Sequence, residues 1–167
     1  LFPSFGEEAS RGFYLRDAGL YFVIGEYFDI AMTTDIYTLG SWAVDFNSRY
    51  KVNYKFNGGF TLTYSNDQTG EKGSSDFFQT KNFGVKWTHT QDAKARPGTS
   101  FSASVNFSSP SNSKYNSSSV TEALQNQISS SISYSKNWNG KLNLSINALH
   151  NQNSKDSSYS FTLPNVT

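Results

Sequence analysis

The two histidines are the side chains best suited to proton transfer, so they are the first place to look for catalysis. His89 continues an apolar alternating series that ends at Trp87, and His150 ends a second series that runs through residues 142–148. A hydrolytic site needs a serine and an oriented histidine that converge, but serine is too abundant here for one near a histidine to be informative. No G-x-S-x-G, H-E-x-x-H, Walker or dinucleotide glycine motif is present. We expect both histidines at a rim rather than in a catalytic site, no enzyme activity and no cofactor.

Five charged residues lie close together between positions 7 and 17 and form a candidate electrostatic cluster. They are Glu7, Glu8, Arg11, Arg16 and Asp17. In isolation such a cluster is typical of a solvated turn with local ion pairs, each of which contributes little. The alternative, if the chain forms part of a β-barrel, is a polar hinge at the mouth of that barrel.

A second set of charges shares one phase of an alternating pattern. It comprises Asp45, Arg49, Lys51, Lys55 and Lys86. A lysine or arginine that faced lipid near the membrane midplane would cost about 2 to 4 kcal/mol, so this set must face water or a partner. Such a polar wall is solvated by default, and it could also hold phosphate-bearing lipid heads or contact a partner protein.

The elements that position these charges are predicted by alternation with a period of two. Trp42, Val44 and Phe46 occupy one phase, and charged or amide side chains occupy the other. The pattern recurs and predicts about nine antiparallel strands over residues 13–167 in an up-and-down meander, after a hinge or entry segment at 1–12. The strands are expected near 13–24, 27–37, 42–55, 60–65, 83–88, 101–108, 128–134, 142–148 and 157–163.

The connections between these strands differ in composition and length. Compact, glycine-containing turns are expected at 25–26, 57–59, 92–98 and 137–140. Mostly longer connections rich in Ser, Asn, Gly and Lys are expected at 38–41, 66–76, 109–127 and 151–158. Short turns at one rim and longer loops at the other are typical of an outer-membrane barrel, although a soluble meander or sandwich also alternates its faces.

Aromatic side chains add support for the barrel because many fall near predicted strand ends. They include Tyr27, Tyr37, Trp42, Tyr54, Tyr64, Trp87 and Trp138. Tyrosine and tryptophan gather at membrane interfaces, but aromatics are also good strand formers in any sheet.

Composition narrows the class of protein. Of the 167 residues 36% are hydrophobic, and the net charge of +1 provides no strong field for nucleic acid. The absence of cysteine excludes a disulfide framework and a thiolate metal site. The chain opens at Leu1 without an initiator Met and closes on a turn-like LPNVT, so we interpret it as a piece of a longer protein.

Two stretches resemble a known family. FGEEASRGFYLRDAG at 5–19 and DIYTLGSW at 35–42 are similar to the LptD proteins of Bacteroidetes, which are outer-membrane barrels that assemble lipopolysaccharide at the cell surface. NWNGKLNLSINALHNQ and SFTLPNV, nearer the end, fit the same family. The resemblance covers essentially the whole chain.

This resemblance implies a location in the cell outer membrane and a set of partners. The family's architecture has a periplasmic jelly roll upstream, a very large barrel and an LptE-type plug lipoprotein inside it. The chain would form the first hairpins of that barrel. Its partners would be lipopolysaccharide, the plug, the periplasmic Lpt bridge acting through the jelly roll, and membrane lipid, with no nucleic acid.

The resemblance also implies a lateral gate between the first and last strands of the barrel, with residues 13–24 on the gate side. Related barrels weaken this gate with prolines, whereas Pro3 is the only proline in the first 96 residues here. Gly12, Gly19 and Gly25 are therefore candidates to loosen the pairing, and a valine at position 19 is expected to stiffen the edge. The alternatives are a soluble surface β-sandwich that binds a glycan or other ligand, and a porin-like or phospholipase-like barrel.

Overall fold

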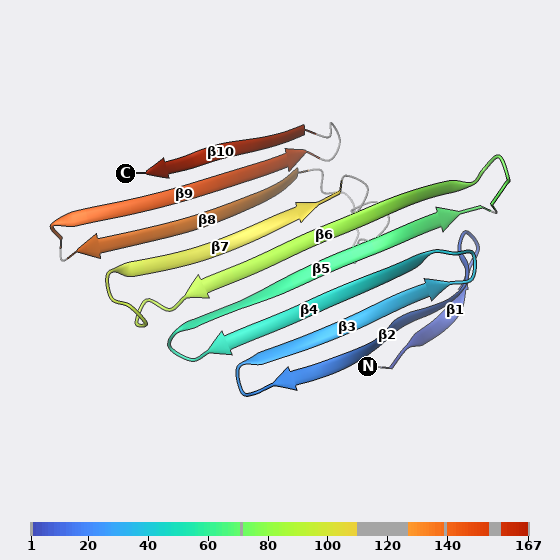
Figure 1. Cartoon of the computed structure of the whole chain (residues 1–167), viewed down its shortest axis with the longest axis horizontal. Helices are drawn as coiled ribbons and strands as arrows, with labels where there is room; N and C mark the ends of the chain where they lie inside the picture. The colour runs from blue at the N-terminus through green and yellow to red at the C-terminus, as the bar shows by residue number, and fades with distance from the viewer. Residues whose placement is uncertain (1, 71, 110–126, 139, 154–157, 167) are drawn as a thin grey trace.

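The computed structural model of the chain is one open antiparallel sheet of ten strands, each paired with its neighbours in sequence order. It describes residues 2–70, 72–109, 127–138, 140–153 and 158–166. Figure 1 shows the hairpins laid side by side in one layer, with the N-terminal and C-terminal strands at opposite edges. The strands are β1 (Ser4–Glu8), β2 (Gly12–Ile24), β3 (Phe28–Tyr37), β4 (Trp42–Val52), β5 (Phe56–Thr69), β6 (Phe78–Gln91), β7 (Thr99–Ser108), β8 (Gln127–Trp138), β9 (Leu142–Asn153) and β10 (Ser158–Val166).

The all-β, antiparallel meander expected from alternation is confirmed. The additional strand is β1, which lies inside the segment 1–12 expected as a hinge and pairs with the start of β2. None of the described residues forms a helix that is long and apolar enough to span a membrane.

The connections lie at two rims of the sheet. We call one the turn rim, with connections at 25–27, 53–55, 92–98 and 139–141, and the other the loop rim, with connections at 9–11, 38–41, 70–77, 109–126 and 154–157. The difference in length is weaker than expected, because 92–98 is nearly as long as 70–77 and 38–41 is short. Residues 110–126 and 154–157, in two of the expected long loops, lie outside the described residues.

The expected turn at 57–59 is wrong: the chain turns at 53–55, and Gly58 lies within β5. In the sheet register Gly58 is flanked by Tyr50 on β4 and His89 on β6. The Tyr50 hydroxyl crosses over the glycine to meet His89 Nδ1 at 2.9 Å and to accept a hydrogen bond from Trp87 Nε1 at 3.0 Å. A Cβ at Gly58 would overlap the Tyr50 hydroxyl and the Thr88 carbonyl oxygen. This glycine therefore permits close approach of a neighbouring side chain.

The register gives the sheet two chemically opposite faces. One row across β2 to β7 consists of large apolar side chains: Leu20, Met32, Phe46, Leu62, Val85 and Phe107. The adjacent row on the other face consists of Gly19, Thr33, Asp45, Thr63, Gly84 and Ser108. We call these the apolar face and the polar face.

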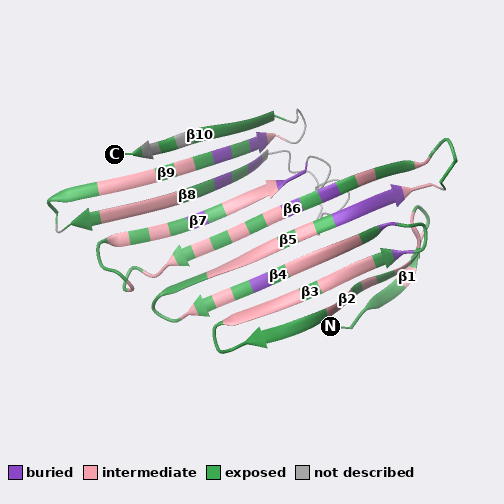
Figure 2. Cartoon of the chain, in the orientation of Figure 1, coloured by how far each residue is buried: buried purple, intermediate pink, exposed green. Residues whose placement is uncertain are grey.

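The described part of the sheet has no hydrophobic core of its own. Among the described residues, the buried hydrophobic side chains are only Tyr37, Ala103 and Ile128. Leu20 remains 64% exposed and Phe161 70% exposed. Figure 2 shows burial concentrated toward the loop rim, with the longest buried stretch at the end of β5. Since a β-sandwich would bury one face of each sheet in a second layer, the described residues do not form the soluble sandwich kept as an alternative.

Aromatic clusters border the apolar face near both rims. Close to the turn rim, the His89 ring lies 5.6 Å from Phe56, 5.2 Å from Phe101 and 5.8 Å from Tyr50. Close to the loop rim, Trp42 and Tyr64 lie 5.5 Å apart. The eight residue steps from Phe56 to Tyr64 span about 26 Å at about 3.3 Å per residue, which matches an apolar band about 25 Å tall.

Tyr37 is an exception to the expected aromatic girdle. It pairs with Tyr14 in register and lies on the polar face, where it is 6% exposed. Its position at a strand end suggested an interface residue, but its phase in the strand directs it to the opposite face.

We predict that Gly58→Ala lowers stability by about 1 to 3 kcal/mol, because the added methyl group displaces Tyr50 and overpacks the strand. The measurement is the temperature at which the folded protein is lost in detergent, followed by heat-modifiable gel mobility. Gly59→Ala is the matched control, since the nearest atom to its Cβ would be the Ser48 carbonyl oxygen at 3.3 Å. Equal losses for the two variants would contradict a specific role for the Tyr50 crossing.

Candidate functional site

The polar face carries its charged side chains on one part of the sheet. In the described strands, the charges of this face lie on β1 to β6, whereas the polar phase of β7 to β10 presents Ser, Asn and Thr with Leu149 as the apolar exception. The candidate site is therefore on the N-terminal part of the wall.

Four of the five residues expected on the interior wall share the polar face. In register, Asp45 faces Thr63, Arg49 faces Gly59, Lys51 faces Asn57, and Lys86 faces Thr61. Lys55 instead lies in the turn 53–55 at the turn rim. The cationic members Arg49, Lys51 and Lys86 lie in the half of the wall nearer the turn rim, and Asp45 lies nearer the loop rim.

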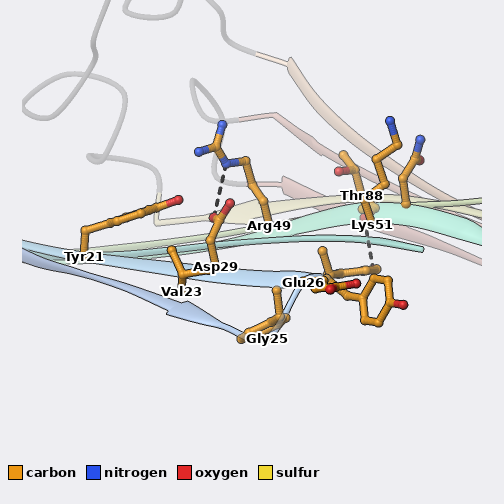
Figure 3. A pocket seen from close by; sticks show the side chains of 13 residues that line it. Tyr21, Val23, Gly25, Glu26, Asp29, Arg49, Lys51 and Thr88 are labelled. Carbon is orange, nitrogen blue, oxygen red and sulfur yellow. Dashed lines mark hydrogen bonds and ion pairs between the residues drawn. The ribbon is translucent and has the colours of Figure 1, made fainter. Parts of the chain in front are cut away.

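Arg49 and Lys51 border a groove of about 480 Å³ on this face. Arg49 Nε lies 3.3 Å from Asp29 Oδ1, yet the arginine side chain remains 76% exposed and available to an anion. Figure 3 shows Asp29, Arg49 and Lys51 rising from the same side of the sheet. The groove therefore presents cationic groups to solvent, together with the carboxylates of Asp29 and Glu26, which also line it.

The other side of the groove is apolar. Tyr21 and Val23 of β2 line it, and both are exposed. Sequence reasoning missed these two residues. The available signal was the run Leu20–Ile24, where alternation breaks down and both phases become apolar. The groove is consequently amphipathic, with cations and apolar side chains side by side.

Three of the five residues in the expected hinge cluster come together at the loop rim. Glu8 Oε2 lies 2.7 Å from Arg16 and 3.1 Å from Arg11. Arg16 Nε donates to the Tyr37 hydroxyl at 2.7 Å, and the Arg11 guanidinium lies 4.3 Å from the centre of the same ring.

The other two members of the cluster lie apart from this network. Glu7 pairs with Phe13 and has the phase of the apolar face. Asp17 lies at a bulge in β2 with a φ of 59°, and its backbone N–H donates to Asp35 Oδ1 at 2.8 Å.

The network continues into residues that sequence reasoning missed. Arg11 reaches Asp67 on β5 at 3.4 Å, and Asp67 accepts hydrogen bonds from Ser65 at 2.7 Å and Asn82 at 2.8 Å. Ser65 and Asn82 are fully buried. No local sequence pattern indicates these contacts, because Arg11 and Asp67 are 56 positions apart.

The three candidate gate glycines occupy three different settings. Gly12 has a φ of 79° beside Thr38, and Gly25 has a φ of 66° in the turn 25–27 with open space around it. Both conformations favour glycine. Gly19 is different, since a Cβ there would overlap the Met32 carbonyl oxygen and press on Thr33. A valine at 19 would push β2 away from β3, which corrects the expectation that it stiffens the edge.

Each histidine lies near a rim of the sheet, as expected, and the structure adds that the two rims are opposite and that both rings lie in aromatic clusters. His150 contacts Phe107 and Phe161, with ring centres 5.5 Å and 4.6 Å away. Its Nδ1 is 3.4 Å from the Ser130 hydroxyl, but that hydroxyl donates to the Asn106 carbonyl at 2.7 Å and accepts from the Asn106 N–H at 2.8 Å. The serine thus acts as a backbone partner for β7. Within the described ranges, no group of three or more His, Asp or Glu side chains is placed to hold a metal ion.

We predict that Gly19→Val loosens the first hairpin instead of tightening it, with a loss of about 1 to 3 kcal/mol from overpacking against β3. Hydrogen exchange of the β2 and β3 amides measures this directly. Faster exchange of these amides is expected in the variant. Slower exchange would show instead that valine stiffens the edge. Gly59→Ala serves as a control, because the three atoms nearest its Cβ belong to β4 and β6 and not to β3.

Comparison with known proteins connects this two-faced sheet to a family. The family model described as LptD protein matches residues 1–167. Searches of curated proteins and of solved structures gave no match. The LptD family acts in lipopolysaccharide transport or assembly at the outer membrane and is not an enzyme family. The chain belongs to the LptD family.

Proposed function

We propose that this chain forms part of the wall of an outer-membrane β-barrel that translocates lipopolysaccharide and assembles it at the cell surface, without catalytic chemistry of its own. The observation that carries the proposal is the two-faced sheet with an uncovered apolar face, found in a member of the LptD family. Lipid covers the apolar face, and the polar face lines the path of the substrate. The exposed edges at β1 and β10 are completed by further strands, as open edges require.

The amphipathic groove at the turn rim is the part of the wall that suits the substrate best. Lipopolysaccharide carries phosphate groups and acyl chains on one molecule. Arg49 and Lys51 offer charge-assisted contacts to phosphate, and Tyr21 and Val23 offer apolar contact beside them. In the orientation typical of these barrels the short turns face the periplasm, so the groove lies where substrate enters.

We propose the remaining partners from the same orientation and from the chemistry of the polar face. An LptE-type plug lipoprotein contacts the polar face, and the uncharged Ser and Asn surface of β7 to β10 suits a neutral partner there. The periplasmic Lpt bridge delivers substrate through a jelly-roll domain. Gly12, Gly19 and Gly25 lie along β2 and its two turns, on the gate side of the wall.

A photo-crosslinking experiment tests this function. A photoreactive amino acid at Val23, in the full-length gene product in cells, is expected to capture lipopolysaccharide. The same probe at Leu62 on the apolar face should capture phospholipid. Capture of lipopolysaccharide at neither Val23 nor any other polar-face position would contradict transport along this wall.

The cationic side of the groove generates a quantitative prediction. Arg49→Gln with Lys51→Gln should lower lipopolysaccharide capture at Val23 about fivefold, which corresponds to about 1 kcal/mol for partly exposed charges. Lys94→Gln, an exposed cation in the turn 92–98, is the matched control. Undiminished capture in the double variant, with or without a loss in the control, would refute the phosphate-binding role.

A further inference from the structure

The end of the first hairpin is bound to a strand three places away in the sheet. Arg11 lies in the connection between β1 and β2, and Asp67 lies on β5, with β3 and β4 between them. Their side chains meet at 3.4 Å and are only 20% and 8% exposed. Since ion pairs in largely buried surroundings are costly to break from one side, this contact is a strong structural link.

The link is supported by hydrogen bonds between neighbouring connections at the loop rim. Thr38 N–H donates to the Phe13 carbonyl at 2.9 Å, and Leu39 N–H donates to the Arg11 carbonyl at 3.3 Å. Ser41 then exchanges two hydrogen bonds with the Gln68 backbone, at 2.8 and 2.9 Å. The loop rim is therefore tied together from the first hairpin to β5.

The edge formed by β1 and β2 has two unlike parts. β1 pairs only with Gly12–Arg16, and a bulge follows between Leu15 and Ala18. Among the described residues, no strand pairs with the outer side of Gly19–Ile24. The part near the loop rim is thus held on the polar face by Glu8, Arg11 and Asp67, whereas the part near the turn rim depends on β3 alone.

We propose that Glu8, Arg11 and Asp67 form a lock that makes β1 a fixed edge of the wall. When a strand that meets β1 separates to open this edge, that strand moves and β1 stays in place. The proposal rests on the transport function above, because an opening at this edge is useful only if substrate leaves through it. The lock itself is a property of the sheet and is measurable without substrate.

The first test measures the rigidity of β1 in the purified full-length protein. Spin labels at Ser4 on β1 and Asn47 on β4, both exposed, report their separation by pulsed electron spin resonance. A single narrow distance distribution is expected. It should broaden in Asp67→Asn and at least as much in Arg11→Gln, which also loses the Glu8 ion pair. The double variant should broaden no further than Arg11→Gln, because both substitutions remove the same Arg11–Asp67 contact. Arg96→Gln, in the turn 92–98, should leave it unchanged. A broad distance distribution in the parent protein would contradict the proposed lock. An unchanged distribution in Arg11→Gln would contradict it as well.

The second test distinguishes a fixed edge from a moving one in cells. The pair Arg11→Cys and Asp67→Cys should sensitise cells several-fold to a large antibiotic, and joining the thiols with a short bis-maleimide should restore resistance while lipopolysaccharide still reaches the surface. Linked protein that no longer delivers lipopolysaccharide, where the unlinked pair does, would show that β1 must move and would overturn the proposal. If even the parent protein delivers none, the proposed function fails and the spin-label distances alone decide the lock.

Discussion

The structure depends on one constraint, which is that a single-layer sheet cannot bury its own apolar face. Large apolar side chains on β2 to β7 form continuous rows across the sheet, while only Tyr37, Ala103 and Ile128 are buried hydrophobic residues in the described part of the chain. Burial of a large apolar side chain contributes about 1.5 to 3 kcal/mol, so this face gains stability only from an external apolar environment. The aromatic clusters near the rims, about 26 Å apart along a strand at about 3.3 Å per residue, fit the thickness of that environment.

The polar face follows from the same constraint. Once lipid covers one side, most of the charges in the described strands lie on the other, where they can meet water, substrate or a partner. Those in the apolar phase, Glu7, Lys81 and Lys136, lie toward the ends of their strands. Within that face the charges separate further. Glu8, Arg11, Arg16 and Asp67 neutralise one another at the loop rim, whereas Arg49 and Lys51 remain exposed beside the groove at the turn rim. One set contributes to structure, and the other is available for binding.

The sequence predicted those features that depend on neighbours along the chain. Alternation located the strands after residue 12, the polar phase of Asp45 to Lys51, and the rim positions of both histidines. It failed where the deciding neighbour lies on another strand. Gly58 resembled a turn residue because it lies in the run Asn57-Gly58-Gly59. Its role in the structure is to leave room for Tyr50 of the neighbouring strand β4. The contacts of Tyr37 and Asp67 with Arg16 and Arg11 could not be predicted from the sequence, since only the register of the folded sheet brings these residues together.

If the apolar face contacts lipid while the polar face contacts water, spin labels on the two faces of one strand must differ in solvent accessibility, and this difference tests the proposed barrel wall directly. Labels at Leu62 and Thr63 of β5, in the full-length protein in bilayers, are exposed in turn to oxygen and to a water-soluble nickel complex. We expect oxygen to relax mainly the Leu62 label and the nickel complex to relax mainly the Thr63 label. If the nickel complex reached the Leu62 label as readily as the Thr63 label, the apolar face would be in water and could not be the lipid-facing side of a barrel wall.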